Sequence, residues 1–264
     1  TLPALMARFL NEKGKPNHFS VINFGENGFN SLLEAKYLEK TFIERRETPD
    51  LIIFYDGAND CFQYVEHRQP NGHIGYRRLK AFIESYRSGW LGILKPINAA
   101  IYASYTNEFI DRIRMLRDPV KPDSPTLQKM VDLCVAGYDR IAKLAHCYNT
   151  DFLLIWQPML WVEDCQVDRT VLKGERNTFL DIAKFPAMKD SVNIIYDKLE
   201  STLSTKPYFL SLRNALCTRK RVSFYPDGIH LNNHGNEVMA KVIGELLIKK
   251  FPARICPQKT PNPL

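Results

Sequence analysis

The sequence predicts an α/β fold, a parallel sheet with helices on both faces, in a single domain over residues 1–264. Short apolar runs rich in β-branched and aromatic residues alternate with longer amphipathic patterns, as expected for strands alternating with helices. The short runs are apolar on both faces, which is typical of strands covered from both sides. At 264 residues and 45% hydrophobic, the chain is also long enough for one large core.

Four of the short runs are predicted strands. They lie at residues 18–25 (HFSVINFG), 50–57 (DLIIFYDG), 151–158 (DFLLIWQP) and 208–212 (YFLSL). Helical patterns occur at residues 1–14, 30–46 and 234–250. A further helix is predicted from Pro125, because Ser124 can cap it, proline suits its first turn, and apolar residues then recur every three or four positions. This rhythm of strands and helices favours parallel neighbours.

Residues 65–120 are predicted to form a helical insertion. About 65 residues separate the strand at 50–57 from the helix near Pro125, whereas such connections usually have two to six. Much of the insertion has a helical pattern rich in aromatic residues. It either completes the core or forms a lid at the functional edge of the sheet, and the sequence leaves both alternatives open.

Charge and cysteine content narrow the range of partners and cofactors. The net charge of +7 is spread along the chain, so we expect a basic solvated surface and no nucleic-acid partner. The six cysteines form no C-x-x-C pair, and no metal site is expected. Cys165 and Cys217 follow two predicted strands, and the sequence leaves open whether they form a disulfide. No apolar run reaches membrane-spanning length.

Three loops at predicted strand ends carry residues suited to acyl chemistry. They are NFGENGFNS with Gly28, YDGAND with Asn59, and PDGIH with Asp227 and His230. In a parallel sheet, loops at the carboxyl ends of strands converge. Histidine can act as a base near neutral pH, and an aspartate three residues earlier can orient it. An asparagine amide and a glycine N–H can stabilise a negative oxygen.

These blocks resemble those of the SGNH, or GDSL-type, hydrolase family. VINFGENGFNS is similar to the family's second block, YDGAND to its third and DGIHLNNHG to its fifth. The resemblance implies a three-layer, flavodoxin-like sheet of strand order 2-1-3-4-5, and an ester hydrolase that needs no cofactor. It assigns Gly28 and Asn59 to the oxyanion hole, His230 to the general base and Asp227 to the orientation of that base.

The family's first block, Gly-Asp-Ser, has no counterpart in the sequence. Ser124 and Ser191 follow an aspartate but come after the third block, and Ser20 and Ser31 lack the strand-to-turn setting of a nucleophile. In the family, the nucleophile leads into a helix similar to LPALMARFL, which stands at the start of this sequence. We therefore expect the nucleophilic serine on a first strand, N-terminal to Thr1.

The resemblance favours a serine ester hydrolase that acts on a small-molecule ester or on an acylated carbohydrate or lipid. An O-acyltransferase and a non-catalytic glycan- or lipid-binding domain are the alternatives. The presence of Gly28, Asn59, Asp227 and His230 favours catalysis, because a binding domain has no need for all four. The opening sequence resembles that of exported relatives, so we expect a periplasmic or exported protein that is membrane-anchored by an N-terminal segment.

Overall fold

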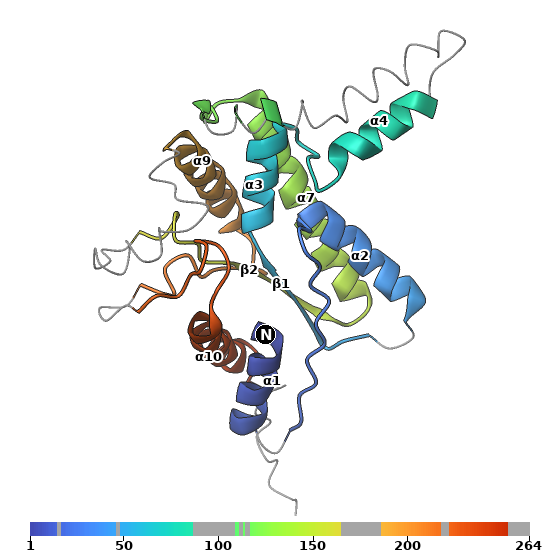
Figure 1. The fold of residues 1–264 in the computed structure, drawn as a ribbon. Coiled ribbons are helices and arrows are strands. Elements are labelled where there is room, and N and C mark those ends of the chain that lie inside the picture. The colour runs from blue at the N-terminus through green and yellow to red at the C-terminus, as the bar shows by residue number, and fades with distance from the viewer. Residues whose placement is uncertain are drawn as a thin grey trace, which may run out of the picture. The chain divides into compact units, whose positions relative to one another are not determined.

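A computed structural model describes residues 1–14, 17–45, 48–86, 109–110, 113, 117–164, 186–217 and 222–252 (Figure 1). The chain divides into two compact units, and each is described by itself. The sheet unit comprises Glu26–Gln157 and Asp181–Leu212. The terminal unit comprises Thr1–Gly25, Pro158–Leu180 and Arg213–Leu264.

A parallel three-stranded sheet lies at the centre of the sheet unit. Its strands are β1 (Leu51–Asp56), β2 (Asp151–Trp156) and β3 (Phe209–Ser211), hydrogen-bonded in the order β1-β2-β3. β2 is paired on both edges, and all its residues except the first are buried, which agrees with its apolar sequence. The parallel pairing and the helices between the strands confirm the predicted α/β class.

Helices α2 (Ser31–Glu44), α7 (Pro125–Cys147) and α9 (Pro186–Leu203) form a layer in which α7 packs against α2, β2 and α9. The helix α7 begins at Pro125 as predicted, and its buried residues recur at helical spacing. The ring of Tyr138 on α7 meets Phe54 edge-on, and its hydroxyl donates to Asp56 Oδ2 over 2.7 Å. These contacts fix the end of β1 against the middle of α7.

The connection after β1 is much shorter than predicted. Helix α3 (Ala58–His67) begins directly after Gly57, which follows the last residue of β1. Gly57 has a φ of 124°, and a Cβ at this position would lie 3.1 Å from the Trp156 ring. Glycine permits both the backbone angle and the close ring, so the strand turns at once into a helix.

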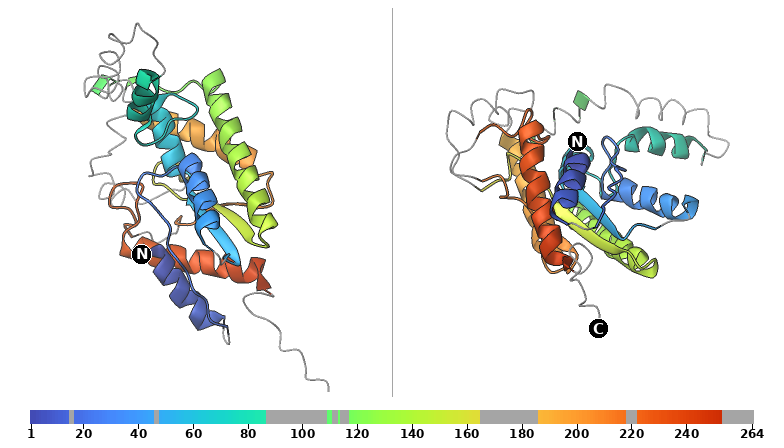
Figure 2. Two further views of the ribbon diagram at one scale, coloured as in Figure 1. Left: turned by 90° about the vertical axis from the view of Figure 1, so that its right-hand side faces the viewer. Right: turned by 90° about the horizontal axis from the view of Figure 1, so that it is seen from below.

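The predicted insertion at residues 65–120 is helical where the structure describes it. It contains the end of α3, the helix α4 (Tyr76–Tyr86), and helical positions at 109–110, 113 and 117. α4 lies at the periphery of the sheet unit (Figures 1 and 2). Residues 87–108 lie outside the described ranges, and the assignment of the insertion as a lid remains a prediction.

Helices α1 (Leu2–Lys13) and α10 (Asn233–Lys250) lie side by side in the terminal unit (Figure 2). Both were predicted from their amphipathic patterns. Their buried apolar side chains include Met6 and Leu10 on α1 and Met239, Ile243 and Leu247 on α10. A Cβ at Gly244 would lie 2.3 Å from Phe9 Cδ1, so this glycine allows α1 to approach α10 closely.

The prediction of a strand at residues 18–25 is wrong for the described structure. The side chain of Asn11 bonds both backbone groups of Phe19: Nδ2 donates to the carbonyl over 2.9 Å, and Oδ1 accepts the N–H over 2.7 Å. Ile22 and Phe24 are exposed. A strand requires a neighbouring strand, and none pairs with this segment within the described residues. The apolar run alone therefore could not predict its conformation.

Cys217 forms a disulfide, whereas Cys61, Cys134 and Cys147 are thiols. Cys165, the partner considered from the sequence, lies outside the described residues, so this pairing is not tested. None of the helices in the described ranges combines the length and the hydropathy that a membrane-spanning segment needs.

Candidate active site

The loop before α10 carries Asp227 and His230 and is anchored at both ends. Asn232 caps α10, since its Oδ1 accepts the N–H of Gly235 over 2.8 Å. The backbone N–H of Asn232 donates to the carbonyl of Phe224 over 2.8 Å, which closes the loop. Phe224 is buried next to Tyr225. The backbone on either side of the two side chains is thus fixed by hydrogen bonds and packing.

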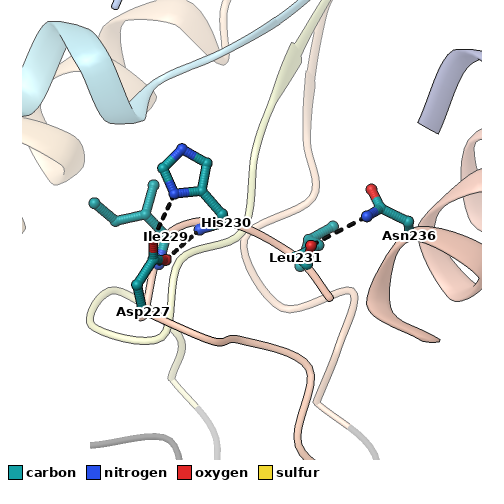
Figure 3. Close-up of polar contacts among 5 residues, drawn as sticks. All are labelled: Asp227, Ile229, His230, Leu231 and Asn236. Atoms are coloured by element: carbon teal, nitrogen blue, oxygen red, sulfur yellow. Dashed lines mark hydrogen bonds and ion pairs between the residues drawn. The ribbon is translucent and has the colours of Figure 1, made fainter. Parts of the chain in front are cut away.

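Asp227 contacts the residues directly after it (Figure 3). Its Oδ1 accepts the N–H of Ile229 over 3.0 Å and that of His230 over 2.7 Å, and its Oδ2 lies 2.6 Å from His230 Nδ1. An ionised carboxylate only accepts hydrogen bonds, so Nδ1 carries the hydrogen. Nε2 then has a lone pair that can take a proton. The Asn236 amide donates to the Leu231 carbonyl over 3.1 Å and ties the following backbone to α10.

The electrostatics of the loop keep Asp227 ionised. Partial burial raises the pKa of Asp227, but hydrogen bonds from the His230 ring and from the N–H groups of His230 and Ile229 outweigh it. Its pKa therefore lies below the ordinary value of 3.8. The His230 side chain is 73% exposed. The imidazole is thus held by a carboxylate at one nitrogen and is exposed to solvent, as a general base requires.

Gly228 makes the turn between Asp227 and His230 possible. It has a φ of 85°, and a Cβ there would lie 2.7 Å from Trp161 Nε1. Its carbonyl accepts the N–H of Leu160 over 3.0 Å. Trp161 is buried, so it has little room to withdraw. Both the backbone angle and the tryptophan therefore require glycine at this position.

The two predicted oxyanion residues meet in the sheet unit. Gly28, with a φ of 73°, lies just before α2, and Asn59 lies in the first turn of α3. Asn59 Nδ2 donates to the carbonyl of Phe29 over 2.6 Å. Gln63 Nε2, one turn further along α3, donates to the carbonyl of Gly28 over 2.6 Å. We call residues 28–31 together with residues 58–63 the Gly28–α3 module.

The Gly28–α3 module retains donors for a negative oxygen. A side-chain amide carries two hydrogens on nitrogen, and the Phe29 carbonyl uses one of those on Asn59. The N–H of Gly28 donates to no protein group within the described residues. One hydrogen on each of these two residues is therefore free to bind an oxyanion.

Asp60 on α3 links the two parts of the module through Ser31 at the start of α2. Its buried carboxylate accepts the Ser31 hydroxyl at Oδ1 over 2.5 Å and the Ser31 N–H at Oδ2 over 3.3 Å. Burial raises the pKa of Asp60, and the hydrogen bonds from Ser31 offset part of that rise. The Ser31 hydroxyl is committed to this carboxylate at the start of α2, which is not the setting of a nucleophile.

Asp56 and Glu34 lie beside Asp60 and carry strongly shifted pKa values. Burial, and then the charge of Asp60, raise the pKa of Asp56 to about 7, despite hydrogen bonds from Glu34 and Tyr138. Burial and the charge of Asp56 raise the pKa of Glu34 well above 4.5. Hence the pair retains a proton near neutral pH. Although three carboxyl groups gather here, no group of side chains among the described residues is arranged to hold a metal ion.

The other three serines considered from the sequence lie in a buried site, at a helix cap and in an irregular segment. Ser191 is fully buried, donates to the Ala187 carbonyl over 2.6 Å and accepts the N–H of Val120 over 2.8 Å. Ser124 is the N-cap of α7, and Ser20 is exposed in the irregular segment after α1. Neither these three nor Ser31 hydrogen-bonds a histidine in the part of the chain that the structure describes.

The sequence matches the family model described as GDSL-like Lipase/Acylhydrolase over residues 1–243. The chain therefore belongs to the GDSL-like lipase and acylhydrolase family, which confirms the resemblance found in its loops. Membership implies esterase or acylhydrolase activity as a class. No curated protein and no solved structure matches the chain.

Sequence reasoning missed three residues that support the candidate site: Gln63, Asp60 as a partner of Ser31, and Trp161. A signal for Gln63 was present, because it lies four residues after Asn59 and a helix starting after Gly57 puts both on one face. No local signal pointed to Trp161, because its contact with Gly228 joins distant parts of the sequence.

Proposed function

We propose that the protein is a serine ester hydrolase that works through an acyl-serine intermediate. The observation that carries the proposal is the 2.6 Å contact between Asp227 Oδ2 and His230 Nδ1, which leaves an exposed imidazole with Nε2 able to accept a proton. The family match supports the reaction class. Its substrate in this proposal is a small-molecule ester or an acylated carbohydrate or lipid.

In the acylation step, the serine oxygen attacks the acyl carbon of the ester while His230 Nε2 takes the hydroxyl proton. The tetrahedral intermediate collapses, and the same proton passes to the departing alcohol oxygen. Water then attacks the acyl-serine, His230 takes its proton, and the proton returns to the serine as the acid leaves. In both steps Asp227 stabilises the imidazolium and holds its orientation.

The Gly28–α3 module supplies the oxyanion donors in this proposal. The Gly28 N–H and the second hydrogen of Asn59 Nδ2 would face the negative oxygen of each intermediate. Gln63 and Asp60 hold the backbone and the helix that carry these donors. Donors fixed in advance need no reorganisation when the charge develops, and this makes them effective.

The nucleophile in this proposal is a serine N-terminal to Thr1, on a strand that pairs with β1. Two observations support it. Within the described residues β1 is hydrogen-bonded to a strand on one edge only. None of the four serines considered in the described structure has a histidine partner.

Labelling with a fluorophosphonate tests the proposal, because this reagent reacts with an activated serine. The protein is expressed with the residues encoded before Thr1, labelled, digested and mapped by mass spectrometry, and p-nitrophenyl acetate hydrolysis is followed in parallel. We expect hydrolysis and one labelled serine N-terminal to Thr1. A label on a serine within residues 1–264 would refute the placement of the nucleophile. Absence of both label and hydrolysis would instead favour a glycan- or lipid-binding domain.

A further inference from the structure

Helix α4 has its apolar side turned outward. Leu79, Phe82 and Ile83 recur at helical spacing and are 48%, 59% and 40% exposed, whereas Ala81 on the other side of the helix is 5% exposed. A surface helix of a globular protein normally shows the reverse pattern, with its apolar stripe buried. The stripe of α4 therefore presents apolar side chains to solvent in the described structure.

Cationic side chains border this stripe on both sides. At 3.6 residues per turn, Arg78 falls at one edge of the stripe and Lys80 at the other. Arg78 is exposed, and Lys80 is half-buried with its ammonium 6.0 Å from the centre of the Tyr76 ring. Glu84 lies four residues after Lys80 on the same side of the helix, so the Arg78 edge carries the stronger positive charge. An apolar stripe with a cationic edge is typical of a helix that lies flat on a membrane surface.

We propose that α4 binds the surface of a bilayer that contains anionic lipids. Leu79, Phe82 and Ile83 would enter the boundary between headgroups and acyl chains, while Arg78 and Lys80 meet the anionic headgroups. The net charge of +7 favours the same surface over a neutral one. A second copy of the chain could also cover an apolar stripe, but it would bring equal positive charge to the cationic edges. The charges therefore favour lipid, and this binding does not depend on ester hydrolysis.

Co-sedimentation with vesicles tests the proposal. The protein is mixed at low salt with vesicles of phosphatidylcholine alone or with added phosphatidylglycerol. We expect binding only to the vesicles with phosphatidylglycerol, and weaker binding as salt is raised. The double substitution Leu79→Ser with Phe82→Ser should reduce partitioning about tenfold or more, because it removes the inserted apolar groups. Arg78→Ser should reduce it about fivefold.

Two control variants match these changes elsewhere on the sheet unit. Ile43→Ser removes an 84% exposed apolar side chain from α2, and Lys129→Ser removes an exposed cation from α7. Both should bind vesicles as the unmodified protein does, and circular dichroism checks the folding of every variant. Equal binding to the two kinds of vesicle, no binding to either, or full binding by the α4 variants would overturn the proposal. So would lipid-free self-association by sedimentation velocity that only the α4 variants lose.

Discussion

At the scale of single residues, both halves of the candidate site depend on a glycine with positive φ and a side chain packed beside it. A Cβ at Gly28 would lie 2.9 Å from Ile74 Cδ1, and one at Gly228 would lie 2.7 Å from Trp161 Nε1. The Asp-Gly sequence predicts a turn, but it cannot reveal which distant side chain fills the adjacent space. The turn that orients His230 is therefore more sensitive to substitution than its local sequence suggests.

Replacing Gly228 with alanine tests this sensitivity, and Gly75→Ala is its matched control. Gly75 has a φ of 75°, and no atom lies within 4 Å of the place that a Cβ would take, so its substitution adds backbone strain alone, about 1–2 kcal/mol. Gly228→Ala should lower the free energy of unfolding by more, because Trp161 must also move. Urea denaturation measures both. Equal losses in the two variants would show that the tryptophan contact is unimportant.

At the scale of elements, the Gly28–α3 module links the start of α2 to the start of α3. Its hydrogen bonds come from Asn59, Gln63 and Ser31, and all three join residues about 30 or more positions apart. These hydrogen bonds hold the backbone donor of Gly28 and the side-chain donor of Asn59 in one fixed arrangement. Its geometry should therefore affect turnover more than substrate binding.

Gln63→Leu tests that inference, because leucine has a similar size and cannot donate to the Gly28 carbonyl. If Gln63 positions the Gly28 peptide, kcat for an ester should fall about tenfold to a hundredfold with little change in KM. The control is Gln128→Leu on α7, where the amide donates to the exposed Asp132 over 2.8 Å. A rise in KM without loss of kcat, or equal kinetics in both variants, would contradict a positioning role.

The carboxyl group at the end of β1 should make stability depend on pH. The pKa of Asp56 is raised from 3.8 to about 7, so the folded state favours the protonated acid. The stabilisation is complete below the ordinary pKa and is lost as pH rises through about 7. Asp56→Asn keeps an acceptor for the Tyr138 hydroxyl and removes the titration.

Thermal denaturation at about pH 5 and about pH 8 measures this effect. The Tm of the unmodified protein should be lower at the higher pH. The Tm of Asp56→Asn should fall by less. Some decrease should remain, because the pKa of Glu34 is also raised. Asp132→Asn on the surface of α7 serves as the control. An unchanged pH dependence in Asp56→Asn would show that Asp56 is ionised in the folded protein throughout this range.

The elements that could be predicted are those whose pattern is local. The strands at 51–56 and 151–156 have continuous apolar runs, and α7 has a cap, a first-turn proline and a regular stripe. The segment at 18–25 has a similar apolar run, but a strand also requires a partner. Helix α3 was missed because its start depends on the positive φ of Gly57, a conformation that the sequence only permits.

At the scale of the whole molecule, the family and the pairing of Asp227 with His230 followed from short blocks of sequence. The contacts that hold those blocks in place could not be predicted from the sequence. They join distant segments, such as Trp161 with Gly228 and Gln63 with Gly28. Asp227 and His230 belong to the terminal unit, and Gly28 and Asn59 belong to the sheet unit.

The most direct test of this account compares initial rates of p-nitrophenyl acetate hydrolysis at neutral pH. The protein with its preceding N-terminal residues is measured beside His230→Ala, Asn59→Ala and His146→Ala, which changes an exposed histidine on α7. His230→Ala should lose about a thousandfold in kcat by removing the base, and Asn59→Ala about a hundredfold to a thousandfold by removing an oxyanion donor. His146→Ala should retain full activity. Hydrolysis by His230→Ala at the rate of the unmodified protein would contradict the central claim.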